Sequence, residues 1–580
     1  MNYASSTAPF DIRIDNARLV DGSGGPASTG SLGIREGRIA ALGKIDGDAV
    51  RVIDAQGSIL APGFVDIHTH YDAQAFWDPT LSPSSHFGVT TVVSGNCGFS
   101  IAPLSGNEDD AAYLMRMLAR VEGMPLEALK AGVPWDWVTF ADFLNRLDGR
   151  TALNMGFMVG HSALRRAVMG ARAVGNKADA QEIAAMQHLL RLSLQAGGMG
   201  FSSTISSTHN DADGNPVPSR FATREELLAL AGVLKDFPGT TLEFLPVMSD
   251  VFPPEQLDLM TDLSKAANRP LNWNVLNPMS KRRDMYESHL GASDYARERG
   301  ARVVPLVTAQ VNTVWVNFIS GFILDTYSGW DELFRQSIPE RIKWLSDPER
   351  RRSIEPGTPG RPVPRRLPSR WDYWTIAEVF HPAYKRFQGK TIGEASKALG
   401  KPPFDAMCEI VVADELRTSL QMPHGGNDEA TWKMRAEAWL DERTIVGASD
   451  AGAHLDMIDS FTAPVQVLAE GVRNRKLLTV EQAVRQLTSV PAGLIGLVDR
   501  GALKIGYHAD LVIFDPDTVG AGPVHMRQDL PAGAGRLFAD AVGVNNVLVG
   551  GCEIVRENEF LGKFPGRILR SGRDTRTVTP

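Results

Sequence analysis

APGFVDIHTHYD, residues 61–72, is the stretch that decides the fold. It begins as an apolar run typical of a buried strand and ends in two histidines one residue apart, His68 and His70. In a strand, residues i and i+2 point to the same side, so these two imidazoles converge. Neutral imidazole is a common zinc ligand, and the pair is therefore a candidate for half of a metal site. The alternative is a solvent-facing pair that binds nothing.

Strands alternate with helices from residue 61 onwards. After the strand predicted at 63–68, seven further apolar segments of strand length follow, and segments with helical spacing separate several of them. They lie at 89–94, 152–160, 197–204, 240–247, 270–276, 301–307 and 443–449. This order predicts an α/β protein with a closed (β/α)8 TIM barrel, whose active site forms at the carboxyl ends of the strands. His68 and His70 lie at that end of the first strand.

Three helix starts carry a capping-box pattern, in which a short polar residue is followed three positions later by Glu or Gln. The pairs are Asp179 with Glu182, Thr223 with Glu226, and Thr479 with Gln482.

Both ends of the chain alternate apolar and polar residues, as strands do. We predict a small composite β-sandwich from residues 1–60 and 498–565, and a catalytic barrel over 61–497. The barrel contains an insertion at 309–442, which we expect to cover its mouth and contribute to the substrate pocket. A surface subdomain with its own small core is an equal alternative. The insertion holds Trp315, Trp330, Trp344, Trp371, Trp374, Trp432 and Trp439.

The composition is that of a globular protein, with 43% hydrophobic and 22% charged residues. A net charge of −8 argues against nucleic acid or an anionic membrane surface as the main partner. Three scattered cysteines form no disulfide framework, so the cytoplasm is the expected compartment. Residues 1–15 show no signal-peptide pattern, and no apolar run is long enough to span a bilayer.

Two further residues lie near the predicted barrel mouth. Cys97, in GVTTVVSGNCGFS, follows the second strand, and Asp450, in VGASDAGAHLD, ends the eighth. A thiolate there would bind zinc, and a carboxylate could both bind the metal and accept a proton from metal-bound water. The structural alternatives are a small buried thiol for Cys97 and a helix N-cap for Asp450.

The stretches GFVDIHTHYD, GVTTVVSGNCGFS and GASDAGAH resemble the amidohydrolase superfamily. VGHSALRRAVMG, at 159–170, and residues 198–222 resemble its N-acyl-D-amino-acid deacylase (D-aminoacylase) branch. The resemblance implies that His68, His70 and Asp450 bind metal, that Asp450 is also the general base, and that Cys97 is the branch's cysteine ligand. It implies Zn²⁺, as one or two ions, with another divalent metal as the alternative.

The sequence departs from this branch on strands five and six, where the resemblance leads us to expect histidines. Strand five offers Glu243, and strand six offers Asn272 and Asn274; a lysine expected just after strand six is also absent. Glu243 is therefore a candidate replacement ligand, with pairing to an arginine as the alternative. Further candidates, for contact with the substrate or its oxyanion, are His209, His161 and His454, of which His209 is also a candidate for the metal.

The leading hypothesis is a hydrolase that cleaves a linear amide in a small N-acyl compound, an N-acyl amino acid or an N-acyl amine with an apolar or aromatic group. A hydroxide generated on the metal attacks the carbonyl, and Asp450 carries the proton to the leaving nitrogen. The missing lysine and the tryptophans favour the apolar substrate. Two alternatives are a cyclic amide or carbamate hydrolase and a non-catalytic scaffold. Assembly of the chain into a homo-oligomer is also compatible with the sequence.

Overall fold

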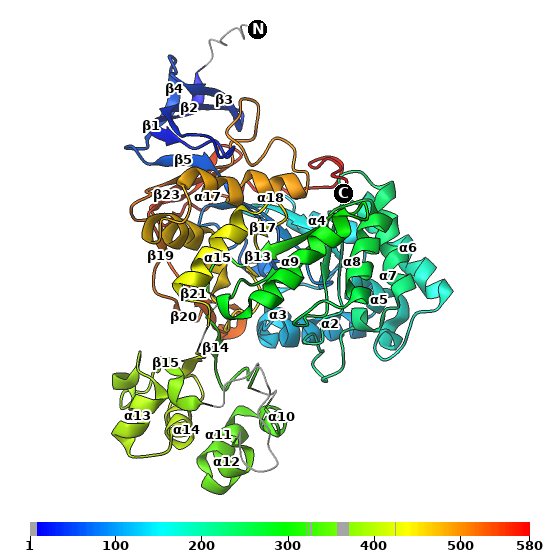
Figure 1. Ribbon diagram of the computed structural model, residues 1–580, viewed down its shortest axis with the longest axis vertical. Helices are drawn as coiled ribbons and strands as arrows, with labels where there is room; N and C mark the ends of the chain where they lie inside the picture. The colour runs from blue at the N-terminus through cyan, green and yellow to red at the C-terminus, as the bar shows by residue number, and fades with distance from the viewer. Residues whose placement is uncertain (1–8, 312, 322, 325–326, 356–369, 424) are drawn as a thin grey trace.

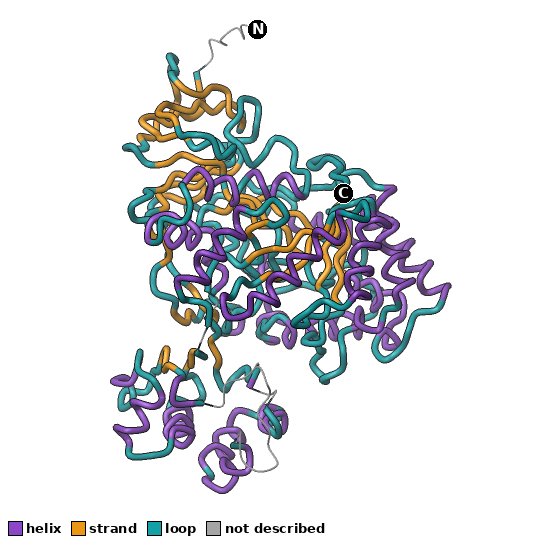
Figure 2. Tube along the Cα trace, viewed as in Figure 1, coloured by secondary structure: helices purple, strands orange, loops and turns teal. Residues whose placement is uncertain are grey.

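The computed structural model describes residues 9–311, 313–321, 323–324, 327–355, 370–423 and 425–580. Figure 1 shows three regions: strands near the N-terminus, a central body of strands and helices, and a helical lobe that projects from this body. Figure 2 shows that strands run through the body while helices lie around them.

Strands from both ends of the chain pair in a single nine-stranded sheet. The two ends meet where β5 pairs antiparallel with β18, with Leu511 opposite Pro62. The pairing defines one sheet and does not define the two facing sheets of the predicted sandwich. Its strands are β1 (Phe10–Leu19), β2 (Ser28–Arg35), β3 (Arg38–Gly43), β4 (Ala49–Asp54), β5 (Ile59–Pro62), β18 (Leu511–Phe514), β23 (Val544–Val549), β24 (Cys552–Arg556) and β25 (Glu559–Phe560).

The body contains parallel strands in two sheets, and each of the eight segments predicted from the sequence contributes to them. One sheet has the order β6-β7-β8 and the other β17-β13-β12-β11-β10-β9. The strands are β6 (Phe64–Asp66), β7 (Val89–Ser94), β8 (Asn154–Phe157), β9 (Val159–Gly160), β10 (Gly200–Thr204), β11 (Thr241–Leu245), β12 (Leu271–Leu276), β13 (Val303–Val307) and β17 (Ile445–Val446).

The third predicted strand, 152–160, is divided at Met158, so that its two parts, β8 and β9, belong to different sheets. Met158 donates its N–H to Ser94 at the end of β7, whereas the neighbouring Val159 pairs with β10. At the other boundary, an isolated parallel bridge joins Thr69, beyond β6, to Ala451, beyond β17. The carboxyl ends of β6 and β17 are therefore neighbours.

Amphipathic helices connect the parallel strands. Asp179 and Thr479 form the predicted capping boxes, but Thr223 caps its helix alone, because Glu226 turns inward to other partners. None of the described helices has the length and apolarity needed to cross a membrane. The helices are α1 (Gln74–Trp77), α2 (Glu108–Val121), α3 (Leu126–Gly132), α4 (Phe140–Leu147), α5 (His161–Met169), α6 (Ala180–Gln195), α7 (Arg224–Ala231), α8 (Pro254–Ala267), α9 (Arg283–Arg297), α15 (Glu429–Leu440), α16 (Ala463–Gln466), α17 (Val480–Leu487) and α18 (Ser489–Leu494).

The lobe has a small hydrophobic core of its own, which includes Trp330, Trp371 and Trp374. Trp432 and Trp439 belong to the main core, and residues 356–369 lie outside the described residues. Burial in these cores explains the tryptophans without a substrate, so they give no support to an aromatic pocket. The lobe contains α10 (Trp330–Phe334), α11 (Ile338–Ser346), α12 (Pro348–Ile354), α13 (Ile392–Leu399), α14 (Pro403–Ala413), β14 (Trp315–Val316), β15 (Thr375–Glu378) and β16 (Ser419–Gln421).

Two short antiparallel pairs complete the described strands. They are β19 (Gly520–Ala521) with β22 (Ala541–Val542), and β20 (His525–Arg527) with β21 (Arg536–Phe538).

Candidate metal centre

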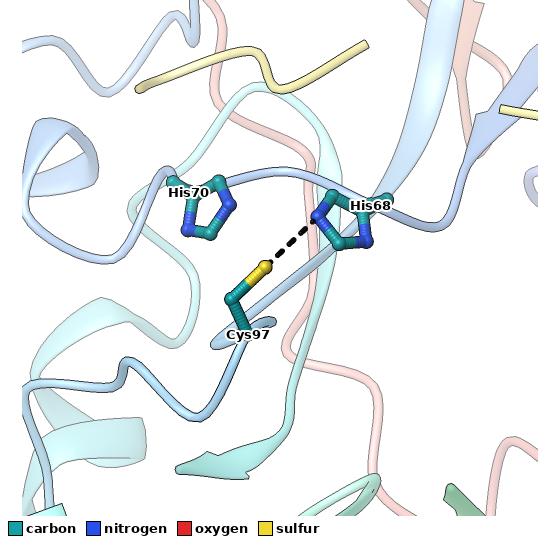
Figure 3. Close-up of side chains that lie close together, drawn as sticks. All are labelled: His68, His70 and Cys97. Atoms are coloured by element: carbon teal, nitrogen blue, oxygen red, sulfur yellow. Dashed lines mark hydrogen bonds between the residues drawn. The ribbon is translucent and has the colours of Figure 1, made fainter. Parts of the chain in front are cut away.

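His68 and His70 follow β6, and both are almost fully buried. Thr69 between them is fixed to β7, because its backbone N–H and its hydroxyl both donate to the carbonyl of Val93, at 3.0 and 2.9 Å. The backbone N–H of His70 donates to Ala451 at 2.8 Å. The backbone is thus held on both sides, and the two imidazoles lie with ring centres 5.4 Å apart. Figure 3 shows both rings beside Cys97.

Cys97 brings its sulfur to this pair from the loop after β7. Its Sγ lies 3.6 Å from Nε2 of His68, the contact drawn in Figure 3. One potential ligand atom from each of His68, His70 and Cys97 lies within 4.8 Å of the others. Cys97 has φ +55°, a left-handed conformation that side chains disfavour and that often occurs at functional sites. Ser202 on β10 holds this loop, since its hydroxyl accepts the N–H of Gly98 at 3.0 Å.

Asp450 completes the group from the loop after β17, also with a positive φ, +52°. Its Oδ1 lies 3.3 Å from Nε2 of His68 and 3.6 Å from Nε2 of His70. Burial alone would raise the pKa of Asp450, but the two imidazoles outweigh burial and hold it well below its usual range. The carboxylate is therefore ionised at neutral pH and faces the Nε2 atom of each histidine.

The field at this group is negative, which a bound cation would balance. Burial would lower the pKa of His70, but Glu122 and Asp450 outweigh it and raise the pKa to about 9. Burial raises the pKa of Glu243 to about 8 and that of the Cys97 thiol well above its usual value. Two imidazoles, a thiol and a carboxylate are a donor set that zinc accepts. The residues therefore fit one divalent metal ion.

The strand-five and strand-six residues reach this group differently. Glu243 on β11 uses Oε2 to accept the N–H of Cys97 at 2.9 Å, while its buried Oε1 has no hydrogen-bond partner among the described residues. Asn274 on β12 places Nδ2 3.2 Å from Nε2 of His68. Asn272 turns away and donates to the carbonyl of Leu242. The alternative that was left open, pairing of Glu243 with an arginine, is not found among the described residues, and the hydrogen bond of Glu243 is to the cysteine loop.

A cavity of about 180 Å³ opens beside the metal-ligating group. The predicted residues His209 and His454 line it. Burial, with His454 and His70 nearby, lowers the pKa of His209 to about 3, so its ring is neutral. The cavity is lined by His70, Cys97, Glu122, Ser206, Thr208, His209, Leu245, Met248, Asn274, Val275, Asp450 and His454.

His161 lies elsewhere, in the buried core. Its Nδ1 is 2.8 Å from the hydroxyl of Ser203 and its Nε2 is 2.9 Å from Oε1 of Glu226, so both ring nitrogens have protein partners. Arg165 donates to both oxygens of Glu226, at 2.5 and 2.6 Å. His161 therefore has the contacts of a structural histidine, because neither of its ring nitrogens is left for a substrate.

Glu122 is an ionisable residue of the cavity that the sequence did not indicate. It follows α2 directly, is 2% exposed, and faces both His70 and His454. A Glu–Gly pair after a helix is an ordinary helix end, and the partners of Glu122 are far away in sequence, so no local pattern marks it.

These strands and side chains define a class of protein: an α/β fold that gathers metal-ligating residues at the carboxyl ends of parallel strands. The chain belongs to the Amidohydrolase family, whose sequence pattern matches residues 51–555. The D-aminoacylase of Alcaligenes xylosoxydans xylosoxydans is 27% identical over 573 residues, which cover 97% of this chain and 98% of that protein. The predicted resemblance is thereby confirmed.

Solved structures of related proteins share the fold. The structure of N-acyl-D-glutamate deacylase from Bordetella bronchiseptica, complexed with zinc and a phosphonate inhibitor, matches with TM-score 0.63 and 25% identity, covering 97% of this chain and 100% of that one. A structure of D-aminoacylase, determined in work on its binuclear metal centre, matches with TM-score 0.64 and 24% identity at the same coverage.

Proposed function

We propose that this chain is a metal-dependent hydrolase that cleaves the linear amide of small N-acyl compounds, with N-acyl amino acids and N-acyl amines as the substrate class. One observation carries the proposal: two imidazoles, a thiol and an ionised carboxylate from three separate loops meet beside a cavity. A scaffold has no use for this arrangement. The deacylase relatives that cover nearly the whole chain support amide hydrolysis.

Zinc is the proposed cofactor, with His68, His70, Cys97 and Asp450 as its ligands and Oε1 of Glu243 as a further oxygen donor. The two histidines would bind through Nε2, since both Nε2 atoms face Asp450. Bound zinc would supply Lewis acidity toward the substrate carbonyl and lower the pKa of a water molecule to about 7.

The chain's own residues perform the proton transfer and the positioning. Asp450 is the general base: it is ionised, and its side chain is 25% exposed, so it can receive a proton from water in the cavity. The same carboxyl group then delivers the proton to the leaving nitrogen. His209 is neutral, and the hydroxyl of Thr204 lies 3.0 Å from its Nδ1. Its other ring nitrogen is left for the oxygen of the substrate carbonyl, and His454 lines the cavity beside it.

The supporting architecture is proposed to be a closed (β/α)8 barrel over residues 61–497, with a mouth-side insertion at 309–442 and a smaller domain from residues 1–60 and 498–565. Apolar side chains from β6, β7, β13 and β17 form one cluster with Met158 and Met199, as the interior of a ring of strands would. The bridge from Thr69 to Ala451 joins the first and last strands. We retain the cytoplasm as the proposed compartment.

Exhaustive chelation followed by metal readdition tests the proposal. Hydrolysis of an N-acyl-D-amino acid, of the corresponding N-acyl amine, of a cyclic imide and of a carbamate should be compared by amine release. We expect the linear amides to be cleaved, activity to disappear on chelation, and zinc to restore it. Full activity in metal-free protein would refute the mechanism, and preference for the ring substrate would favour the cyclic-amide alternative.

A further inference from the structure

Glu122 is a buried carboxylate that lines the cavity. Neither the fold nor the proposed chemistry gives this residue a role. Its side chain is 3% exposed, and among the described residues its ion pairs are with two histidines and with no lysine or arginine. A buried carboxylate needs compensating partners. These partners therefore show what the residue does.

The first partner is His70. Oε1 of Glu122 lies 3.7 Å from Nδ1 of His70, whereas Nε2 of the same ring faces Asp450. The imidazole is thus placed between two carboxylates, one on each nitrogen. Metal-binding histidines commonly donate the N–H opposite the metal to a carboxylate, which fixes the tautomer and the ring orientation. Glu122 occupies that outer position.

The second partner is His454, four residues beyond Asp450 on the same loop. Oε2 of Glu122 lies 4.0 Å from Nε2 of His454, and the backbone carbonyl of Glu122 also accepts the N–H of His454. The next residue, Gly123, has φ +57°, and a Cβ there would lie 3.3 Å from Cα of His454. The chain after α2 therefore approaches the Asp450 loop closely, and a glycine permits the approach.

We propose that Glu122 is the positioning residue of this centre: it orients His70 toward the metal through Nδ1 and joins the loop after α2 to the loop that carries Asp450 and His454. This inference rests on the proposed metal site. It makes Glu122 a determinant of metal affinity and of the placement of His454, without contact with the reacting atoms.

The experiment compares Glu122→Gln and Glu122→Asp with Glu108→Gln, which changes an exposed carboxylate on α2, the helix that Glu122 follows. Zinc affinity is measured by competition with a chromogenic chelator, and kcat and KM are measured at saturating zinc. We expect Glu122→Gln to lower the affinity for zinc about 10–100-fold. With zinc bound at saturation, the same variant should show a kcat about tenfold lower and a smaller change in KM. Glu122→Asp should regain part of both, and Glu108→Gln should match the parent protein.

The outcomes separate this inference from the proposed function. Zinc affinity is read without any substrate, so an inactive parent protein would refute the function and leave the affinity comparison decisive for Glu122. Equal zinc affinity in Glu122→Gln and Glu108→Gln would overturn the inference. If Glu122→Gln does not fold, Glu122→Asp decides, since its shorter side chain should still weaken zinc severalfold, and an unchanged affinity there overturns it too.

Discussion

Glu243 on β11 accepts the backbone N–H of Cys97 at 2.9 Å, so one carboxyl group fixes the cysteine loop and keeps its second oxygen buried without a hydrogen-bond partner among the described residues. The sequence presents the same residue as a substitute for a histidine ligand. The structure shows that Glu243 forms a hydrogen bond to the Cys97 loop. This contribution to the loop and the proposed contribution to metal binding can be separated by mutation.

Glu243→Gln should preserve the structure of the Cys97 loop but weaken the binding of the metal. The amide oxygen can still accept the N–H of Cys97, so we expect the melting temperature of the metal-free protein to change little. Loss of the negative charge should weaken zinc about 10–100-fold. Glu243→Ala should weaken zinc binding and also destabilise the loop. It leaves the buried N–H of Cys97 unpaired, which lowers the free energy of unfolding by about 1–3 kcal/mol. Chelator competition and thermal unfolding distinguish the pair; equal zinc affinity in Glu243→Gln and the parent protein would exclude a ligand role.

Cys97→Ser should abolish tight metal binding. The serine hydroxyl fits the site but is a poor substitute for a thiolate, so we expect a loss of zinc affinity of at least about 100-fold, beyond the effect of an outer-sphere change. Cys408→Ser is the matched control, because that thiol is equally buried but lies in the core of the lobe. Elemental analysis of purified protein should show zinc missing from the first variant alone. Stoichiometric zinc in Cys97→Ser would remove Cys97 from the ligand set.

Sequence periodicity located all eight parallel segments because each is a short apolar run between helices. It missed the interruption at Met158, since that break depends on which neighbouring strand each backbone group meets. His68, His70, Cys97 and Asp450 could be found because each ends or follows a strand. Glu122 could not, because its partners come from distant loops. The tryptophans of the insertion could not choose between a substrate pocket and a small separate core, since bulky side chains fill a core as readily as they line a pocket; the structure shows the core.

Asp450→Asn should remove most of the activity while preserving the fold. The amide is isosteric but cannot accept and return a proton, and general acid–base groups contribute about 10²–10⁴-fold to rate. We expect kcat to fall within that range at zinc concentrations that saturate the variant. Asp456→Asn, on the same loop, is the control, and it should retain activity within a few-fold. If Asp450→Asn keeps its kcat while fully loaded, another group must carry the proton.

Glu226 provides a test of stability away from the metal. It pairs with His161 and Arg165 in the core, so Glu226→Gln leaves a buried guanidinium without its counter-charge. Breaking such a pair lowers the free energy of unfolding by about 3–5 kcal/mol. The control is Glu182→Gln, the corresponding position of the neighbouring helix, where the side chain completes a capping box and pairs with the exposed Arg172. There we expect a change within about 1 kcal/mol.

The difference in free energy of unfolding between the parent protein and Glu226→Gln should depend on pH. Burial raises the pKa of Glu226, but His161 and Arg165 outweigh it and hold the pKa below the ordinary value of 4.5. The carboxylate's stabilisation is therefore fully present above pH 4.5 and is lost as pH falls through the folded-state pKa. Burial also lowers the pKa of His161, so protonating it destabilises the fold below its ordinary 6.5. Denaturant unfolding should show the difference in free energy of unfolding between the parent protein and Glu226→Gln narrowing as the pH falls below 4.5. A difference that stays constant there would mean that the charge on Glu226 does not stabilise the fold.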